Sequence, residues 1–149
     1  GVDAATFYKL VEARREGIAE TMLAIDKAAN NTSVVFCLNW RGRKLLFAGD
    51  AETRSWREMN DRGVLEPVDL LKISHHGSHN GTPDEEMLEI LLPGTEPAGR
   101  HGLLSTRHDV HNGVPHYETL GRLGRRCVVK STESIAPGEY HEIEITPDD

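Results

Sequence analysis

The chain has 149 residues, enough for one domain with a hydrophobic core, and its 38% hydrophobic and 28% charged residues are typical of an ordinary globular protein. A net charge of −7 argues against broad nonspecific binding to nucleic acid, and no apolar stretch approaches the roughly 20 residues of a membrane span. No signal-peptide pattern is present. Cys37 and Cys127 lie in apolar runs, so we expect buried, reduced thiols rather than a disulfide and, from this, a cytoplasmic location.

The N-terminal third predicts a helix followed by a hairpin. Because the chain begins with Gly1 rather than methionine, we expect sequence upstream of it to be missing. Residues 4–29 carry apolar side chains at helical spacing, which predicts a leading helix within residues 1–29. Residues 33–40 and 44–48 predict two strands joined by a tight turn. Residues 52–62 then predict a short helix that ends at Gly63.

The remaining residues alternate predicted strands and helices. We expect helices at 82–93 and 115–123, with Thr82 as N-cap of the first and Pro83 at its first helical position. We expect strands at residues 68–74, 102–106, 127–131 and 140–145. This order predicts one layered α/β unit over residues 1–149. The early strands are apolar on both faces, so we expect helices on one side of the sheet and another covering on the other.

Two predicted strands end in residues of the types that bind metals. Asp50 follows Gly49 at one strand end, and His75 and His76 follow another. An aspartate before a helix is also an ordinary N-cap, but its pairing with the histidine strand favours a ligand. Adjacent histidines on extended backbone point to opposite sides, so we expect only one of the two to be a direct ligand. Gly77 suits a left-handed turn.

Other polar residues are weaker candidates. Ser78 can hydrogen-bond back to its loop, and surface positions are the expectation for four scattered histidines, His101, His108, His111 and His116. His116 is the strongest of the four because it starts a helix beside Pro115. The sequence also has a basic stretch, made of Arg122, Arg125, Arg126 and Lys130. We expect these residues to be a solvated helix face and strand end, and the alternative is a local basic patch.

Several motifs are absent from the sequence. It contains no Gly-x-Ser-x-Gly elbow of serine hydrolases and no Gly-x-x-x-x-Gly-Lys-Ser/Thr phosphate loop. The dinucleotide fingerprint Gly-x-Gly-x-x-Gly and the Cys-x-x-Cys pair are missing as well. These absences argue against a Ser/His/Asp hydrolase, a nucleotide-binding domain of those two kinds, a zinc ribbon and thioredoxin-like chemistry.

The order of these motifs resembles the C-terminal half of metallo-β-lactamase-fold hydrolases, closest to the metallo-hydrolase domain of DNA-uptake (competence) channel proteins. The similarity covers roughly residues 30–145 and is carried by residues 31–35, 45–50, 68–78, 104–106, 113–123, 128–132 and 138–145. The Gly-Asp and His-His-Gly-Ser elements are specific in combination. The resemblance implies half of an αββα sandwich, one mixed sheet with flanking helices, and a metal centre at the sheet edge, often with two zinc ions.

The resemblance also assigns roles to individual residues. Asp50 matches the aspartate that can bridge two metals, and one of His75 and His76 matches the late histidine ligand. His116 matches a histidine near the cleft, whereas Val114 stands where relatives often have histidine. The main metal motif of the family, His-x-His-x-Asp-His, does not occur in this sequence. Two or three ligands cannot close a zinc site, so we expect this chain to be about half of the domain.

The implied function is a metal-dependent hydrolase in which metal-bound hydroxide attacks a phosphodiester or another ester. Zinc is the expected metal and manganese the alternative, with Asp50, His75 and His76 as metal residues. The same reading gives catalytic roles in substrate positioning or charge stabilisation to His116, Lys72 and Ser78. We expect the isolated chain to be inactive and its inner sheet face to be covered by the missing N-terminal half, a second chain or a second copy.

Two alternatives remain open at this point. The first is a non-catalytic binding or scaffolding module that keeps the fold without metal, which the missing motif favours. The second is a serine- or cysteine-based hydrolase that uses a histidine of the cluster.

Overall fold

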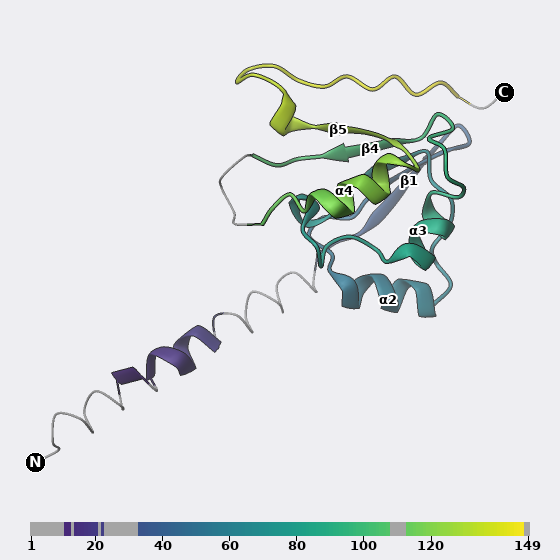
Figure 1. Ribbon diagram of the computed structural model, residues 1–149. Helices are drawn as coiled ribbons and strands as arrows, with labels where there is room; N and C mark the ends of the chain where they lie inside the picture. The colour runs from purple at the N-terminus through teal and green to yellow at the C-terminus, as the bar shows by residue number, and fades with distance from the viewer. Residues whose placement is uncertain (1–10, 13, 21, 23–32, 108–112, 148–149) are drawn as a thin grey trace, which may run out of the picture.

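The computed structural model describes residues 11–12, 14–20, 22, 33–107 and 113–147. Their strands form one five-stranded mixed sheet in the order β1-β2-β3-β4-β5 (Figure 1). The chain is therefore of the α/β class, as the alternation of predicted elements indicated, and its arrangement is consistent with half of an α/β sandwich. Within the described residues, no helix is both long enough and apolar enough to cross a membrane.

The sheet begins with the predicted hairpin. Strands β1 (Phe36–Trp40) and β2 (Arg43–Phe47) pair antiparallel. The two turn residues, Arg41 and Gly42, both have positive φ, of 47° and 83°. A two-residue turn of this kind matches the right-handed twist of the strands it joins, which fixes the hairpin register.

The other strands run parallel to β2, and a helix lies in each crossover. These elements are α2 (Thr53–Asp61), β3 (Leu70–Lys72), α3 (Glu85–Leu91), β4 (His101–Leu104), α4 (Tyr117–Gly124) and β5 (Val128–Ser131). Parallel strands bring their C-terminal ends to one edge of the sheet, where open α/β sheets commonly bind ligands. The residues after β2 and β3 therefore share an edge.

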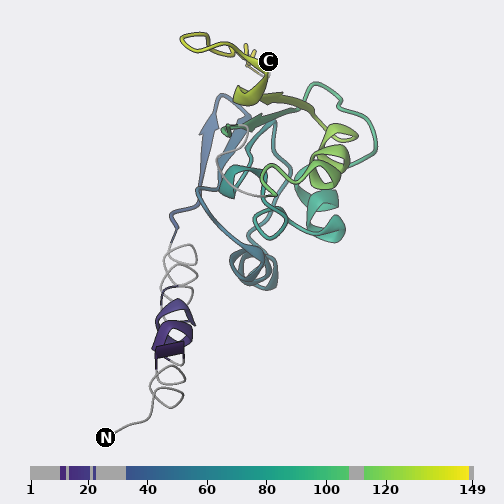
Figure 2. The ribbon, with the colours of Figure 1, turned by 60° about the vertical axis from the view of Figure 1, so that its left-hand side comes forward.

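One face of the sheet and the three helices make the core. Leu46, Leu71, Gly102 and Val129 follow one another across the sheet in register. Buried residues of the same cluster come from all three helices: Trp56, Met87, Leu88, Leu91 and Leu123. Figure 2 shows the β1–β2 hairpin at one side of the folded part and α3 and α4 at the other. Apolar burial against the helices thus holds the sheet together.

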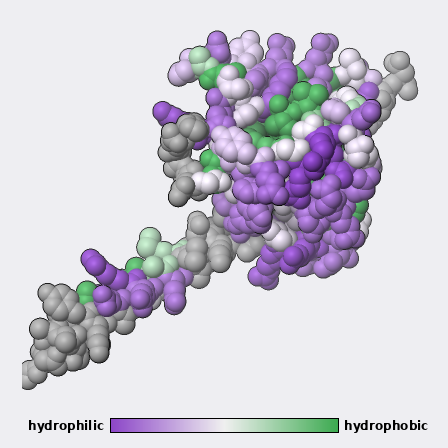
Figure 3. All heavy atoms as spheres, viewed as in Figure 1, coloured by the Kyte–Doolittle hydropathy of each residue, from purple (hydrophilic) through white to green (hydrophobic). Residues whose placement is uncertain are grey.

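The opposite face of the sheet is apolar and exposed along β1, whereas Leu70 of β3 on the same face is only 5% exposed. Phe36, Leu38 and Trp40 alternate along β1 and are 53%, 49% and 42% exposed. Phe36 stacks on Phe47 of β2 with ring centroids 4.9 Å apart. In Figure 3, hydrophobic residues also gather near β5, whereas the surface around α2 is hydrophilic; Val128 of β5 is 45% exposed. Helices α2, α3 and α4 all pack into the one core, as expected for one side of the sheet, and the expected covering of the other side stays a prediction.

The predicted strand at residues 140–145 is wrong. Residues 140–147 are irregular and belong to no ladder. Side chains of the sheet hold this segment instead: Lys130 Nζ donates to the carbonyl oxygen of Glu142, and Arg43 Nε donates to that of Thr146 at 2.8 Å. Alternating residues predict an extended backbone, but side-chain contacts take the place of the strand pairing.

Two smaller predictions differ from the structure, and a third lies largely outside the described residues. Helix α3 starts at Glu85 rather than after Thr82, because Asp84 is the N-cap and its Oδ1 accepts from Met87 N at 3.1 Å. Cys37 is exposed because β1 is an edge strand, whereas Cys127 is buried; both are free. Of the predicted leading helix, residues 11–12, 14–20 and 22 are helical, and the rest of residues 1–29 lies outside the described part.

Candidate functional site

Asp50 lies directly beyond the C-terminal end of β2. Gly49 before it has φ +52°, and a Cβ added at this glycine would lie 3.2 Å from the carbonyl oxygen of Val34. The backbone N–H of Asp50 donates to Ser33 Oγ at 3.1 Å. This turn therefore requires glycine and directs a half-buried carboxylate to the sheet edge.

The histidine turn lies at the same edge, after β3. Its start is fixed by two backbone hydrogen bonds, Ile73 N to Leu103 O at 2.9 Å and His75 N to Gly49 O at 3.1 Å. Ser74 Oγ adds a donor bond to the carbonyl oxygen of Ala51. The bonds from His75 and Ser74 tie the turn to the segment that carries Asp50.

The backbone of the histidine turn is left-handed. His75, His76 and Gly77 have φ of 44°, 54° and 75°. The left-handed turn expected at Gly77 is confirmed, but the extended backbone expected for the two histidines is wrong. Such a conformation costs a non-glycine residue on the order of 1–3 kcal/mol, and it persists only where the surrounding structure enforces it. Strain of this kind often marks functional segments.

The two imidazoles face different partners. His75 Nδ1 lies 3.2 Å from Glu52 Oε1, but the pair lacks hydrogen-bond geometry and is a close polar contact only. His76 Nδ1 donates to the carbonyl oxygen of Ser105 at 2.7 Å. The ring centroids are 6.4 Å apart at an interplanar angle of 60°. The imidazoles therefore point to different partners, and the expectation that only one of them is a direct metal ligand stays a prediction.

These residues alone do not form a complete metal site. Among the residues whose positions are described, no group of three or more His, Cys, Asp or Glu side chains is placed to hold a metal ion. A catalytic zinc needs three protein ligands and a structural zinc four. Asp50, His75 and His76 thus share a sheet edge without meeting this requirement. His108 and His111 lie outside the described residues.

Lys72 is the last residue of β3 and is half-buried beside this edge. Burial lowers the pKa of its ammonium group, and the charge of Asp50 acts in the opposite direction. Its Nζ lies 3.4 Å from the carbonyl oxygen of Ile73, at the limit of a hydrogen bond. The charge of Asp50 therefore acts on the Lys72 ammonium group. The catalytic role of Lys72 stays a prediction.

Ser78 has its hydroxyl engaged inside the loop. Ser78 Oγ donates to Asn80 Oδ1 at 2.9 Å and accepts from Gly81 N at 3.1 Å. The side chain is buried, as expected for a residue that bonds back to its own loop. These contacts give Ser78 a structural role, and a role toward substrate stays a prediction.

His116 is hydrogen-bonded to the histidine turn, but its side chain faces a neighbouring pocket. Its backbone N–H donates to Gly77 O at 2.8 Å, and its Nδ1 lies 2.8 Å from Thr119 Oγ1. Its ring packs edge-on against His79 with centroids 5.0 Å apart. His116 therefore lies next to the sheet-edge residues without joining them.

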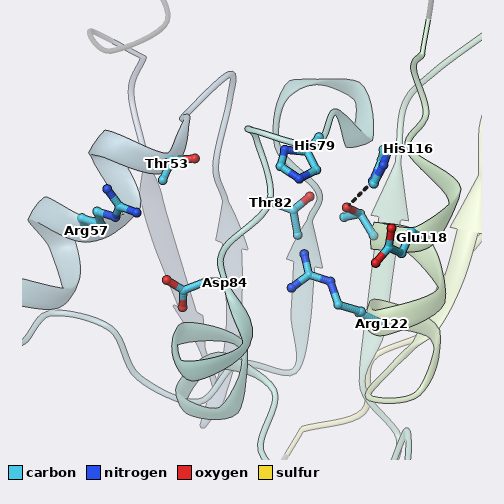
Figure 4. A pocket seen from close by; sticks show the side chains of 9 residues that line it. Thr53, Arg57, His79, Thr82, Asp84, His116, Glu118 and Arg122 are labelled. Atoms are coloured by element: carbon cyan, nitrogen blue, oxygen red, sulfur yellow. Dashed lines mark hydrogen bonds between the residues drawn. The ribbon is translucent and has the colours of Figure 1, made fainter.

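Sequence reasoning missed the polar pocket into which His79 and His116 project. The pocket is about 330 Å³ and lies between α2, the loop before α3, and α4 (Figure 4). Its other walls include Arg57 of α2 and Arg122 of α4. These arginines are far apart in sequence, and only the helical alternation of the chain gave a signal that α2 and α4 pack on one sheet face.

Comparison with known proteins gives one weak relative. ComE operon protein 3 of Bacillus subtilis (strain 168) is 28% identical over 99 residues, which is 66% of this chain. The chain spans 12% of the length of that relative. No family model and no solved structure matches.

Proposed function

We propose that this chain is part of a metal-dependent hydrolase of phosphodiesters or other esters, with zinc as its metal and manganese as the alternative. The observation that carries the proposal is the placement of Asp50 and the His75–His76 turn at one sheet edge, joined by the bond from His75 N to Gly49 O. The resemblance to metallo-β-lactamase-fold hydrolases supports it, as does the similarity to ComE operon protein 3.

The metal centre in this proposal is completed by residues from outside the sequence. The described residues provide no set of three ligands, so this chain would supply only Asp50 and one or both of the turn histidines. The relative is far longer than this chain, which is compatible with further ligands from another segment of a longer protein. No activity is expected from the chain by itself.

The exposed apolar side chains of β1 support the same proposal. Phe36, Leu38 and Trp40 expose about half of their surface on a face that no described helix covers. Burial of apolar surface is favourable by roughly 25 cal/mol per Å², so a second polypeptide layer would stabilise this face. We infer that an N-terminal half-domain covers it, with a second chain or a second copy of this chain as alternatives.

Metal content tests the proposed site. Elemental analysis would compare the purified chain with the chain produced together with its upstream coding sequence. We expect one or two equivalents of zinc or manganese only in the combined sample, and loss of at least one equivalent in Asp50→Ala. Asp61→Ala is the control, because Asp61 is an exposed carboxylate at the far end of α2. A combined sample without metal would refute the hydrolase proposal.

The covering of the sheet face needs a separate measurement. Sedimentation of the chain alone would give a dimer if a second copy covers the face, and Leu38→Lys would then produce a monomer. A monomer that gains stability on co-expression with the upstream segment would instead identify that segment as the covering layer.

A non-catalytic binding or scaffolding module is the second candidate. The lack of a three-ligand group among the described residues is the observation that favours it. If the combined sample binds no metal yet forms a stable complex with its partner, this second function is the better account. A serine- or cysteine-based hydrolase would lose activity to an alkylating reagent rather than to a chelator.

A further inference from the structure

The pocket beside the candidate site is lined mainly by polar side chains. Figure 4 shows the guanidinium group of Arg122 directed toward Thr82 and His79, while Arg57 extends from α2 on the other side. At about 330 Å³ the cavity lies at the small end of the range for small-molecule pockets. Its size and its polar walls suit a compact, charged ligand rather than an apolar one.

The two arginines have little compensation from the protein. The side chain of Arg57 makes no ion pair or hydrogen bond with any residue in the described part of the chain. Arg122 has one ion-pair partner there, Glu85, at 3.7 Å, and Arg126 already binds that carboxylate more closely. Guanidinium groups that line one pocket with weak or absent partners favour an anionic ligand.

Two carboxylates, Asp84 and Glu118, also line the pocket, and they offset the positive charge of the arginines to different extents. Asp84 Oδ1 accepts the hydrogen bond that caps α3, so its charge is stabilised by that helix start. Glu118 lies in the first turn of α4, exposed and close to Arg122 in Figure 4. The negative charge of Glu118 therefore disfavours an anion beside Arg122. A variant without this charge should bind an anionic ligand more tightly.

We propose that this pocket binds a small molecule through a phosphoryl group held between Arg57 and Arg122. A phosphoryl group has three acceptor oxygens and nearly two negative charges, whereas a carboxylate has two oxygens and one charge. Two guanidinium groups on different walls, with His79 between them, offer more donors than one carboxylate can satisfy. The pocket is separate from Asp50 and the histidine turn, so binding requires no metal.

Isothermal titration calorimetry of the full chain with inorganic phosphate at low ionic strength tests the proposal. Arg57→Gln and Arg122→Gln should each weaken binding about tenfold or more, because each removes a charged hydrogen-bond donor. Arg54→Gln is the matched control on the same helix, outside the pocket, and should change affinity less than about twofold. Circular dichroism would check that every variant is folded.

A variant with increased affinity for phosphate cannot be explained by misfolding, whereas a variant with weakened binding could be. Glu118→Gln should bind phosphate several-fold more tightly, since it removes a negative charge beside Arg122. Adenosine 5′-monophosphate should bind more tightly than inorganic phosphate if the ligand is a phosphorylated small molecule. It should bind no more tightly if the ligand is the free phosphate ion. Asp50→Ala should leave phosphate binding unchanged, so a failure of the metal proposal would not affect this result.

Three outcomes would overturn the inference. The first is no heat of binding with either phosphate or the nucleotide. The second is equal weakening by Arg54→Gln and by the two pocket variants, which would indicate nonspecific charge attraction. The third is acetate binding as tightly as phosphate, which would remove the preference for a phosphoryl group.

Discussion

The backbone N–H of His75 donates a hydrogen bond to the carbonyl oxygen of Gly49 at 3.1 Å. This bond joins the turn after β3 to the residue that precedes Asp50. Strands β2 and β3 are parallel neighbours, so their register and this bond together fix the candidate residues at one sheet edge. The geometry of the site therefore depends on the backbone at Gly49 more than on contacts between the candidate side chains.

Gly49→Ala should destabilise the protein. Gly49 has φ +52°, and the new Cβ would lie 3.2 Å from Val34 O, so the substitution adds both strain and a close contact. We expect the free energy of unfolding to fall by about 1–2 kcal/mol in urea denaturation. Gly121→Ala in α4 is the control, with no atom within 4 Å of the added Cβ, and should stabilise by about 0.5–1 kcal/mol. Equal effects of the two substitutions would contradict this account of Gly49.

Trp56 connects α2 to the loop that follows the histidine turn. Its indole Nε1 donates to the carbonyl oxygen of Gly81 at 2.7 Å, and its side chain is fully buried. Trp56→Phe leaves that carbonyl without its partner and should lower the unfolding free energy by about 1–3 kcal/mol. Trp40→Phe on the open face should have a much smaller effect in the same urea titration, because Trp40 is 42% exposed. A smaller loss for Trp56→Phe than for Trp40→Phe would refute this role.

Local signals in the sequence predicted most elements of the fold. The Arg41-Gly42 turn gave the hairpin, and Gly63, with φ +63°, follows α2 where a stop was expected. Strand ends at Asp50 and His75 were also correct to within a few residues, which brought both to one edge. These features depend on glycine conformation and on apolar runs, both of which are encoded in short stretches of sequence.

Features that depend on distant packing could not be predicted in the same way. The left-handed backbone at His75 goes with the close approach of Gly81, where an added Cβ would lie 2.7 Å from His75 Cβ. The Arg57–Arg122 pocket forms only because α2 and α4 pack on the same sheet face. Cys37 shares its apolar pattern with buried strands and is exposed because nothing described covers the edge strand.

Arg126 provides a further case in which burial overrides local pattern. The sequence suggested a solvated residue, but Arg126 is 6% exposed and binds Glu85, Glu89 and the carbonyl oxygens of Leu92 and Gly94. Arg126→Ala should lower the unfolding free energy by about 2 kcal/mol, since the buried carbonyl of Leu92 loses its donor and two ion pairs are lost. Arg125→Ala, at an exposed neighbour, should stay within about 0.5 kcal/mol of the parent. Thermal or urea unfolding of both variants checks the prediction, and equal effects would contradict it.

Cys127 makes stability depend on alkaline pH. Burial raises the pKa of its thiol from 9.0 to about 11, because the thiolate would be desolvated among core residues. Between these values the unfolded chain loses the proton while the folded chain keeps it, so stability falls as pH rises from 9 toward 11. The thiol should contribute a loss on the order of 2 kcal/mol across that range.

Cys127→Ala isolates this contribution from other groups that titrate at the same pH. The variant lacks the thiol, so the difference in unfolding free energy between parent and variant should shrink as pH rises from 9 to 11. Cys37→Ala is the control: Cys37 is exposed on β1, and the difference from the parent should change much less over the same range. Parallel pH profiles for the parent and Cys127→Ala would show that the thiol titrates alike in folded and unfolded chains, contrary to its burial.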